Sequence, residues 1–111
     1  MFILKTEHTF SWPVRAAVPV DGGQFAEATF DCTFKALPQA RLEALVKGEI
    51  SETEFLREAA VGPWTGVESP AGGDLPFSEA ARDQVIAIPY MRLAMIRAYR
   101  EAMSGEAVRK N

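Results

Sequence analysis

The chain has 111 residues, 48% of them hydrophobic, and a formal net charge of −3. This length supports one domain with one modest core, so we treat residues 1–111 as a single domain. The acidic balance and the scattered Lys and Arg residues supply no broad basic surface, which argues against nucleic-acid binding. Because Cys32 is the only cysteine, an internal disulfide is excluded and a reducing cytoplasm fits. Neither a secretory signal nor an apolar run of membrane-spanning length is present, so we expect a cytoplasmic protein with no membrane partner.

The first third of the chain predicts a β-hairpin. The even positions from Trp12 to Val20 are apolar, and two prolines within this run mark it as an edge strand. Asp21-Gly22-Gly23 tolerates positive φ and predicts the turn. A second alternating run places four apolar residues on one face: Ala28, Phe30, Cys32 and Phe34. An isolated two-stranded sheet is marginal in water, so we expect the downstream helices to cover it.

Two short helices are predicted next. Pro38 suits a first helical position, and an apolar stripe continues to Val46 before Gly48 ends the helix. Ser51 and Glu54 form a capping box that starts the second helix. We expect this second helix to continue until Gly62-Pro63 stops it.

A loop and a third helix follow. Residues 64–77 are rich in Gly and Pro and predict an ordered loop, with Trp64 and Phe77 at its ends. Ser78 is typical of a helix N-cap, and an apolar stripe on the helix after it extends to Ile88.

The last helix, which Pro89 starts, carries apolar side chains on two faces. At about 100° per residue, one face carries Met91, Met95, Ala98, Tyr99 and Ala102. The other face carries Leu93, Ile96 and Met103. Such a helix is either sandwiched inside its own domain or shared with a partner. We assign Met91 and Met95 to the core and Met103 to an interface. Residues 104–111 are predicted to form a frayed tail.

Catalytic and metal chemistry has little support in the sequence. The only histidine, His8, lies near the start of the chain, and pairing it with Cys32 requires a third orienting group. The glutamates at 49, 52, 54 and 58 match no recognised metal-binding spacing, and the glycine pairs fit turns rather than phosphate loops. We therefore expect no enzyme, no metal and no cofactor, and keep a hydrolase using His8 and Cys32 only as a remote alternative.

Three arginines of the last helix favour another alternative, a small helical DNA-binding regulator that uses Arg92, Arg97 and Arg100. On the helical projection they span a wide arc interrupted by Leu93 and Ile96, rather than forming a continuous cationic stripe. This alternative predicts an affinity that falls steeply with salt.

The order of short motifs along the chain resembles the tail assembly chaperones of tailed bacteriophages and prophages. These motifs run from Phe34-Lys35 to the terminal Arg-Lys-Asn, and between them stand Val61-Gly-Pro-Trp-Thr-Gly-Val67, Leu75-Pro-Phe-Ser78 and Ile88-Pro-Tyr-Met-Arg92. The resemblance covers most of the chain from about Phe25 to Asn111. One departure is Pro63, which stands where Trp64 is expected to follow the glycine directly.

Such a resemblance implies a non-enzymatic protein. Members of this family bind the long, largely helical tape measure protein, keep it soluble, help to recruit tail tube protein, and are absent from the mature virion. Many of them also have a longer form made by ribosomal frameshifting, and codons for Lys110-Asn111 are compatible with a slippery sequence.

We therefore predict an α+β domain, an N-terminal hairpin packed by about four helices, that acts as an assembly chaperone. The predicted partner-binding residues lie around the loop and on the last helix: Trp64, Phe77, Tyr90, Leu93, Ile96, Arg97, Arg100 and Met103. Substituting Ile96 and Met103 with Asp is predicted to weaken client binding while leaving folding largely intact. The surplus apolar surface also permits self-association.

Overall fold

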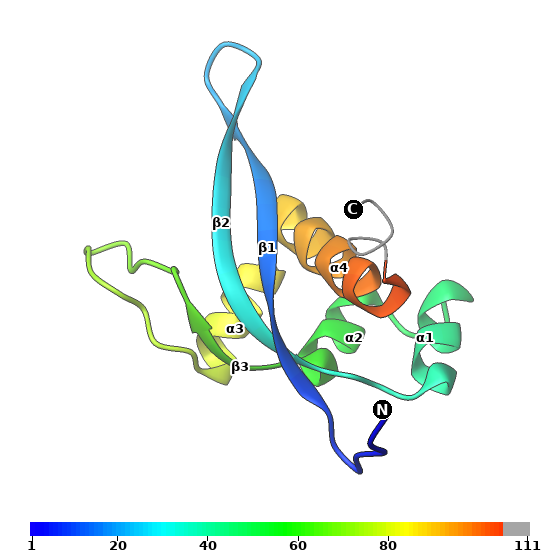
Figure 1. The fold of residues 1–111 in the computed structure, drawn as a ribbon. Helices are drawn as coiled ribbons and strands as arrows, with labels where there is room; N and C mark the ends of the chain where they lie inside the picture. Colours follow the sequence, from blue (N-terminus) through cyan, green and yellow to red (C-terminus); the bar gives the residue numbers. More distant parts are fainter. Residues whose placement is uncertain (106–111) are drawn as a thin grey trace.

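Two long antiparallel strands are the largest feature of the computed structural model, which describes residues 1–105 (Figure 1). β1 spans Thr9–Val20 and β2 spans Gln24–Lys35, and the two strands are paired along their whole length. Gly22 and Gly23 form the turn with φ of 82° and 71°, a backbone region that glycine adopts readily. The predicted hairpin is confirmed, with β1 starting at Thr9 rather than Trp12.

A third strand replaces part of the predicted second helix and loop. β3, Ala60–Thr65, pairs with β2 and makes it the central strand of a three-stranded sheet. The expected helix therefore ends at Ala59, before Gly62-Pro63 is reached. The short run around Gly62 and Pro63 has no clear alternation, so its strand form depends on a partner strand far away in sequence.

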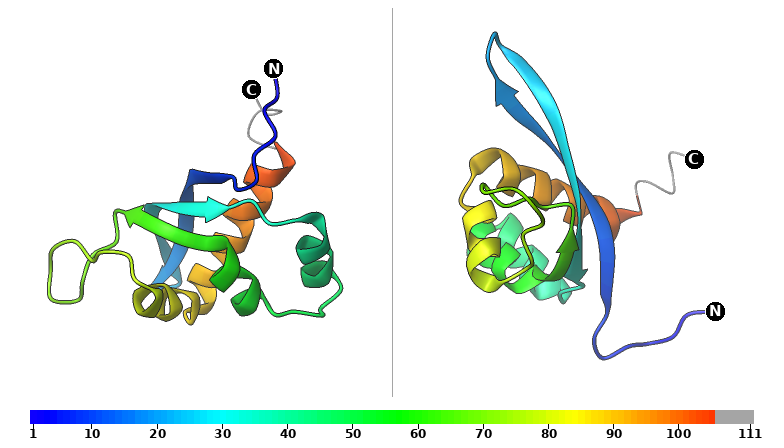
Figure 2. Two further views of the ribbon diagram at one scale, coloured as in Figure 1. Left: turned by 90° about the horizontal axis from the view of Figure 1, so that it is seen from below. Right: turned by 90° about the vertical axis from the view of Figure 1, so that its left-hand side faces the viewer.

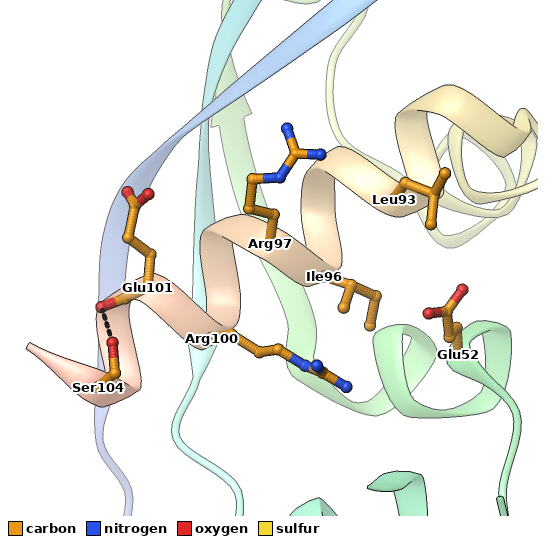
Figure 3. A pocket seen from close by; sticks show the side chains of 7 residues that line it. All are labelled: Glu52, Leu93, Ile96, Arg97, Arg100, Glu101 and Ser104. Atoms are coloured by element: carbon orange, nitrogen blue, oxygen red, sulfur yellow. Dashed lines mark hydrogen bonds between the residues drawn. The ribbon is translucent and has the colours of Figure 1, made fainter. Parts of the chain in front are cut away.

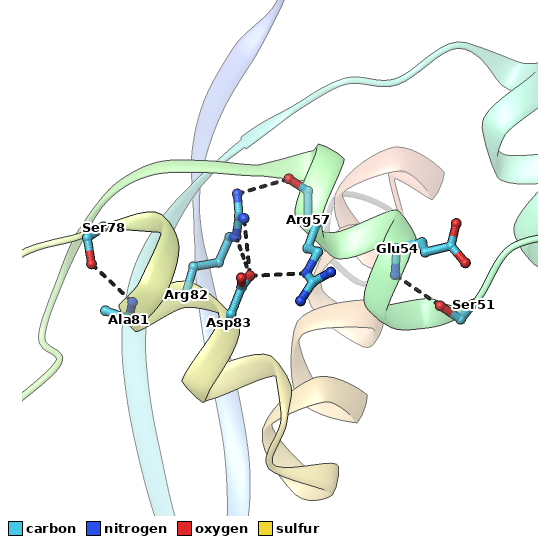
Figure 4. A network of polar contacts seen from close by, with 7 residues as sticks. All are labelled: Ser51, Glu54, Arg57, Ser78, Ala81, Arg82 and Asp83. Atoms are coloured by element: carbon cyan, nitrogen blue, oxygen red, sulfur yellow. Dashed lines mark hydrogen bonds and ion pairs between the residues drawn. The ribbon is translucent and has the colours of Figure 1, made fainter.

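Four helices complete the predicted α+β fold: α1 Gln39–Val46, α2 Glu52–Ala59, α3 Glu79–Ile86 and α4 Pro89–Ser104. The two predicted serine caps are confirmed, because Ser51 Oγ accepts from the Glu54 N–H at 3.1 Å and Ser78 Oγ accepts from the Ala81 N–H at 3.0 Å (Figure 4). Pro89 occupies the first turn of α4, as expected. Pro38 occupies the N-cap position of α1 rather than its first helical position.

An ion-pair network connects α2 with α3 (Figure 4). Arg57 Nε lies 3.3 Å from Asp83 Oδ1, and Arg82 Nη1 donates to the Arg57 carbonyl at 3.0 Å. Arg82 also contacts the same Asp83 carboxylate at 3.1 Å. The network holds the two helices side by side under the sheet.

The helices gather on one face of the sheet, as the right-hand view of Figure 2 shows. The side chains buried on that face alternate along the hairpin: Val14, Ala16, Phe30, Cys32 and Phe34. Tyr99 of α4 packs edge-on against Phe34 and Phe55, with ring centroids 5.8 and 5.1 Å away. Its hydroxyl accepts from the Leu37 N–H at 2.8 Å and lies 3.3 Å from the Lys35 carbonyl oxygen. The predicted cover of the hairpin by helices is therefore confirmed.

The distal part of the hairpin, residues 17–27, projects beyond the helices (Figures 1 and 2). We call it the hairpin arm. It carries exposed apolar side chains, with Val20 47% and Phe25 70% accessible.

At the other end of the chain, α4 ends at Ser104, and Gly105 follows in the left-handed conformation. The frayed tail was predicted to begin at Ser104, and its residues 106–111 lie outside the described part of the chain.

Candidate functional site

A groove of about 500 Å³ runs along the exposed side of α4 and ends against α2 (Figure 3). Its lining comes from one residue of α2 and six of α4: Glu52, Leu93, Ile96, Arg97, Arg100, Glu101 and Ser104. The helical repeat positions them, because residues three and four apart share one side of a helix. Four of the predicted partner-binding residues therefore meet in one groove.

The groove has an apolar centre. Ile96 is only 6% exposed and forms its floor, whereas Leu93 is 51% exposed at its rim. The opposite side of α4 is buried against the sheet and the other helices through residues such as Met95 and Tyr99. The predicted core position of Met95 is confirmed, and Met91 is partly buried against the same core.

The cations around this apolar centre differ in how they are paired. Arg92 is held by Glu52, with Nε 3.1 Å from Oε1. Arg97 and Arg100 have no ion pair or hydrogen-bond partner within residues 1–105. Figure 3 shows their guanidinium groups pointing to different sides of α4, with Ile96 between them. Two unpaired positive charges therefore lie beside an apolar strip made of exposed Leu93 and buried Ile96.

Met103 lies on the same helix and is 39% exposed, but it does not line the groove. Ile96, by contrast, is buried, which corrects the expectation that Ile96→Asp leaves folding intact. An aspartate there would place a charge in the contact between α4 and its neighbours. Leu93 is the better position for a surface substitution.

Trp64 belongs to the core, which corrects its assignment to an accessible surface. The side chain is 6% exposed, and Nε1–H donates to the Leu75 carbonyl at 2.8 Å. Its ring packs edge-on against Phe30 and Phe77, with centroids 5.9 and 5.0 Å away. Partly buried Phe77 therefore fixes the loop to β3, as predicted for the two loop ends.

Tyr90 lies in a second, separate hollow of about 240 Å³. Val18 and Ala28 of the hairpin line one side of it, and Ile88, Tyr90 and Met91 line another. The eight predicted residues thus divide among the core, this hollow and α4 rather than forming one surface.

The remote catalytic pair is not brought together. Cys32 lies opposite Trp12 in the strand register, and His8 precedes β1 four residues before Trp12, about 13 Å away along the strand direction. Burial also raises the pKa of the Cys32 thiol to about 12, so the reactive thiolate is disfavoured. Within residues 1–105, no cluster of three or more His, Cys, Asp or Glu residues is arranged to hold a metal ion. The part of the chain that the structure describes contains no helix long and apolar enough to cross a membrane.

Sequence reasoning missed the exposed apolar residues of the hairpin arm. Phe25 falls on the odd positions of β2, opposite in phase to buried Phe30, Cys32 and Phe34. The alternation in β2 could have predicted this exposure, because it places Phe25 on the face opposite to the buried residues. The first four residues, Met1 to Leu4, are also apolar and exposed.

Comparisons of the chain with protein-family models, with curated proteins and with solved structures find no match in any of the three. The functional inference therefore depends on the motifs of this chain and on the geometry of its surfaces.

Proposed function

We propose that this chain is a non-enzymatic tail assembly chaperone of a tailed bacteriophage or prophage. It binds the tape measure protein in the host cytoplasm, keeps it soluble during tail assembly, helps to recruit tail tube subunits, and is absent from the mature virion. The order of motifs suggests this function, and the groove along α4 is the surface assigned to the client.

The positions of the motifs support the resemblance. Trp64 of the first motif contacts Phe77 of the second and donates its hydrogen bond to Leu75. Tyr90 of the third motif lines the same hollow as Val67 of the first. Motifs that are separate in sequence are thus neighbours in space, as expected if together they maintain one fold. These contacts hold the loop to β3, and the exposed side of α4 remains for the client.

The observation that carries the proposal is the groove. A long helical client presents apolar stripes that aggregate unless they are covered. A groove with an apolar floor accepts such a stripe in the manner of a helix in a groove. Leu93 is 51% exposed, so covering the rest of its side chain contributes about half of a full leucine burial, about 1 kcal/mol.

The test is co-expression with the longest predicted helical protein encoded beside this gene, followed by size-exclusion chromatography with light scattering. We expect a soluble complex that co-elutes, and an insoluble long protein when it is expressed alone. Leu93→Asp is expected to weaken the complex, because it places a charge at the exposed apolar rim of the groove.

Val46→Asp is the matched control, because Val46 is also an exposed apolar helix residue, 73% accessible, and lies outside the groove. It is expected to leave the complex intact. If the wild-type chain forms no complex and elutes as a symmetric oligomer, the chaperone function is wrong. If Val46→Asp weakens the complex as much as Leu93→Asp does, the groove is not the client site.

A further inference from the structure

Within residues 1–105 three arginines have no ion pair, Arg15, Arg97 and Arg100, and the last two are neighbours on α4. The chain has 15 acidic residues against 12 lysines and arginines, so carboxylates are in excess. Four arginines elsewhere in the fold have carboxylate partners, namely Arg41, Arg57, Arg82 and Arg92. Arg97 and Arg100 have none within residues 1–105, although both are exposed on α4 in an acidic chain.

These two arginines stand beside the apolar strip and not on a uniformly polar surface. Arg97 and Arg100 are three residues apart on α4, about 4.5 Å along its axis. Leu93 and Ile96 lie on the same side of the helix, and all four residues line the groove. A ligand that fills the groove therefore meets an apolar centre with a positive charge on each side.

The carboxylates of the groove do not cancel these charges. Glu52 is already paired with Arg92. Glu101 lines the groove one helical turn beyond Arg97, but its carboxylate lies outside ion-pair distance of either arginine. Figure 3 shows Glu101 pointing away from Arg100 and Ile96. The centre of the groove thus remains complementary to negative charge.

We propose that the segment bound in this groove is an amphipathic helix with acidic residues on both sides of its apolar stripe. This inference rests on the proposed function, which supplies a helical client. Leucine, isoleucine or methionine of the client covers Leu93 and Ile96, while Asp or Glu side chains within one turn pair with Arg97 and Arg100. Charge-assisted hydrogen bonds from arginine to carboxylate are the strong ones, and they fix the register of the bound helix.

Nucleic acid fits the groove less well. A phosphate backbone offers no apolar group for Leu93, and Glu101 repels a continuous polyanion at one end of the lining. The apolar strip between the arginines favours a protein ligand.

The experiment compares two double variants that change the net charge equally. Arg97→Glu/Arg100→Glu reverses the charge of the groove, and Lys5→Glu/Lys47→Glu reverses two exposed cations that lie outside the groove. Affinity is measured for the co-expressed client protein and for overlapping synthetic peptides that cover its sequence. We expect the groove variant to lose at least about tenfold in affinity at low salt, and the control to lose less than about twofold. Wild-type affinity falls as salt rises, and the groove variant is less salt-sensitive.

A charge reversal on the client provides the decisive comparison. In the peptide that binds most tightly, the Asp and Glu residues flanking the apolar stripe are replaced by Lys. We expect this peptide to bind the groove variant better than the wild type. Circular dichroism of each variant verifies folding, which the exposed positions of all four cations should preserve.

The outcomes separate the two proposals. If the wild-type chain binds neither the client nor its peptides, the proposed function fails. If the wild type binds but the groove variant binds equally well, the function stands and the acidic-helix inference is wrong. The acidic-helix inference would also be overturned if the peptides that bind tightly had no acidic residues beside their apolar stripe. Nucleic acid that co-purifies with the wild type and not with the groove variant would overturn it as well.

Discussion

Cys32 lies on the central strand with no exposed surface, opposite Trp12 on one neighbouring strand and Trp64 on the other. Burial raises the pKa of its thiol to about 12 because the thiolate is poorly solvated among these side chains. In the unfolded chain the thiol ionises near pH 9. The thiol is therefore protonated in both states below that pH, and only the unfolded state loses the proton as pH rises further.

This difference predicts an alkaline loss of stability. The contribution of Cys32 is fully present below about pH 9 and is lost as the pH rises toward about 12, by about 1.4 kcal/mol per pH unit. Guanidinium unfolding at pH 8 and pH 10 measures it, with Cys32→Ala as the reference that lacks the thiol. Burial also raises the pKa of Tyr99, but Tyr99 is present in both proteins, so its effect on stability cancels in the comparison. Equal alkaline losses in the two proteins would show that the thiol contributes nothing.

At the scale of elements, Gly62 controls how the loop after β3 packs. Its φ is +70°, and a Cβ atom built there overlaps the ring of Phe77. Gly73 has a similar φ of +80° but open space around it. The pair separates backbone strain from steric overlap, because both glycines adopt a left-handed conformation and only one of them touches a side chain.

Gly73→Ala is therefore expected to cost about 1 kcal/mol from backbone conformation alone. Gly62→Ala is expected to cost about 3 kcal/mol, because Phe77 must also leave the Trp64 ring. Thermal and guanidinium unfolding of both variants measure the difference. A loss at Gly62 no larger than that at Gly73 would mean that the contact between Phe77 and β3 adds nothing to stability.

The elements predicted correctly are those with local signals. Ser51 and Ser78 each cap a helix through a backbone N–H three residues ahead, so the sequence window contains both partners. β3 was missed because its partners lie in β2, and the burial of Trp64 depends on Phe30 and Phe77. Leu93 and Ile96 were assigned to one face by periodicity. Tertiary packing beside α2 leaves Leu93 open and buries Ile96, which periodicity alone does not reveal.

Among residues 1–105, exposed apolar side chains gather at Met1–Leu4, along the groove of α4 and on the hairpin arm. The groove along α4 combines Leu93 with unpaired arginines, whereas the hairpin arm combines Val20 and Phe25 with the acidic residues Asp21 and Glu27. The arm extends beyond the helices and beyond β3 (Figure 2). Arg97 of the groove and Phe25 of the arm also line one hollow, so the two candidate surfaces adjoin. Client binding and self-association can still be distinguished by where protection from solvent appears.

Hydrogen exchange along β2 makes this distinction. Phe30 to Phe34 lie in the central part of the sheet, between β1 and β3 and beneath the helices, while Gln24 to Ala28 pair with β1 alone. Backbone amides in a covered sheet exchange only when much of the fold unfolds, whereas the hydrogen bonds of an uncovered two-stranded ribbon break by local unfolding. For an isolated chain, amides in Gln24–Ala28 are therefore expected to exchange at least about tenfold faster than those in Phe30–Phe34. Equal protection that disappears on dilution would contradict this and indicate that a second copy of the chain covers the arm. Equal protection that persists on dilution would mean that the ribbon is stable without any cover.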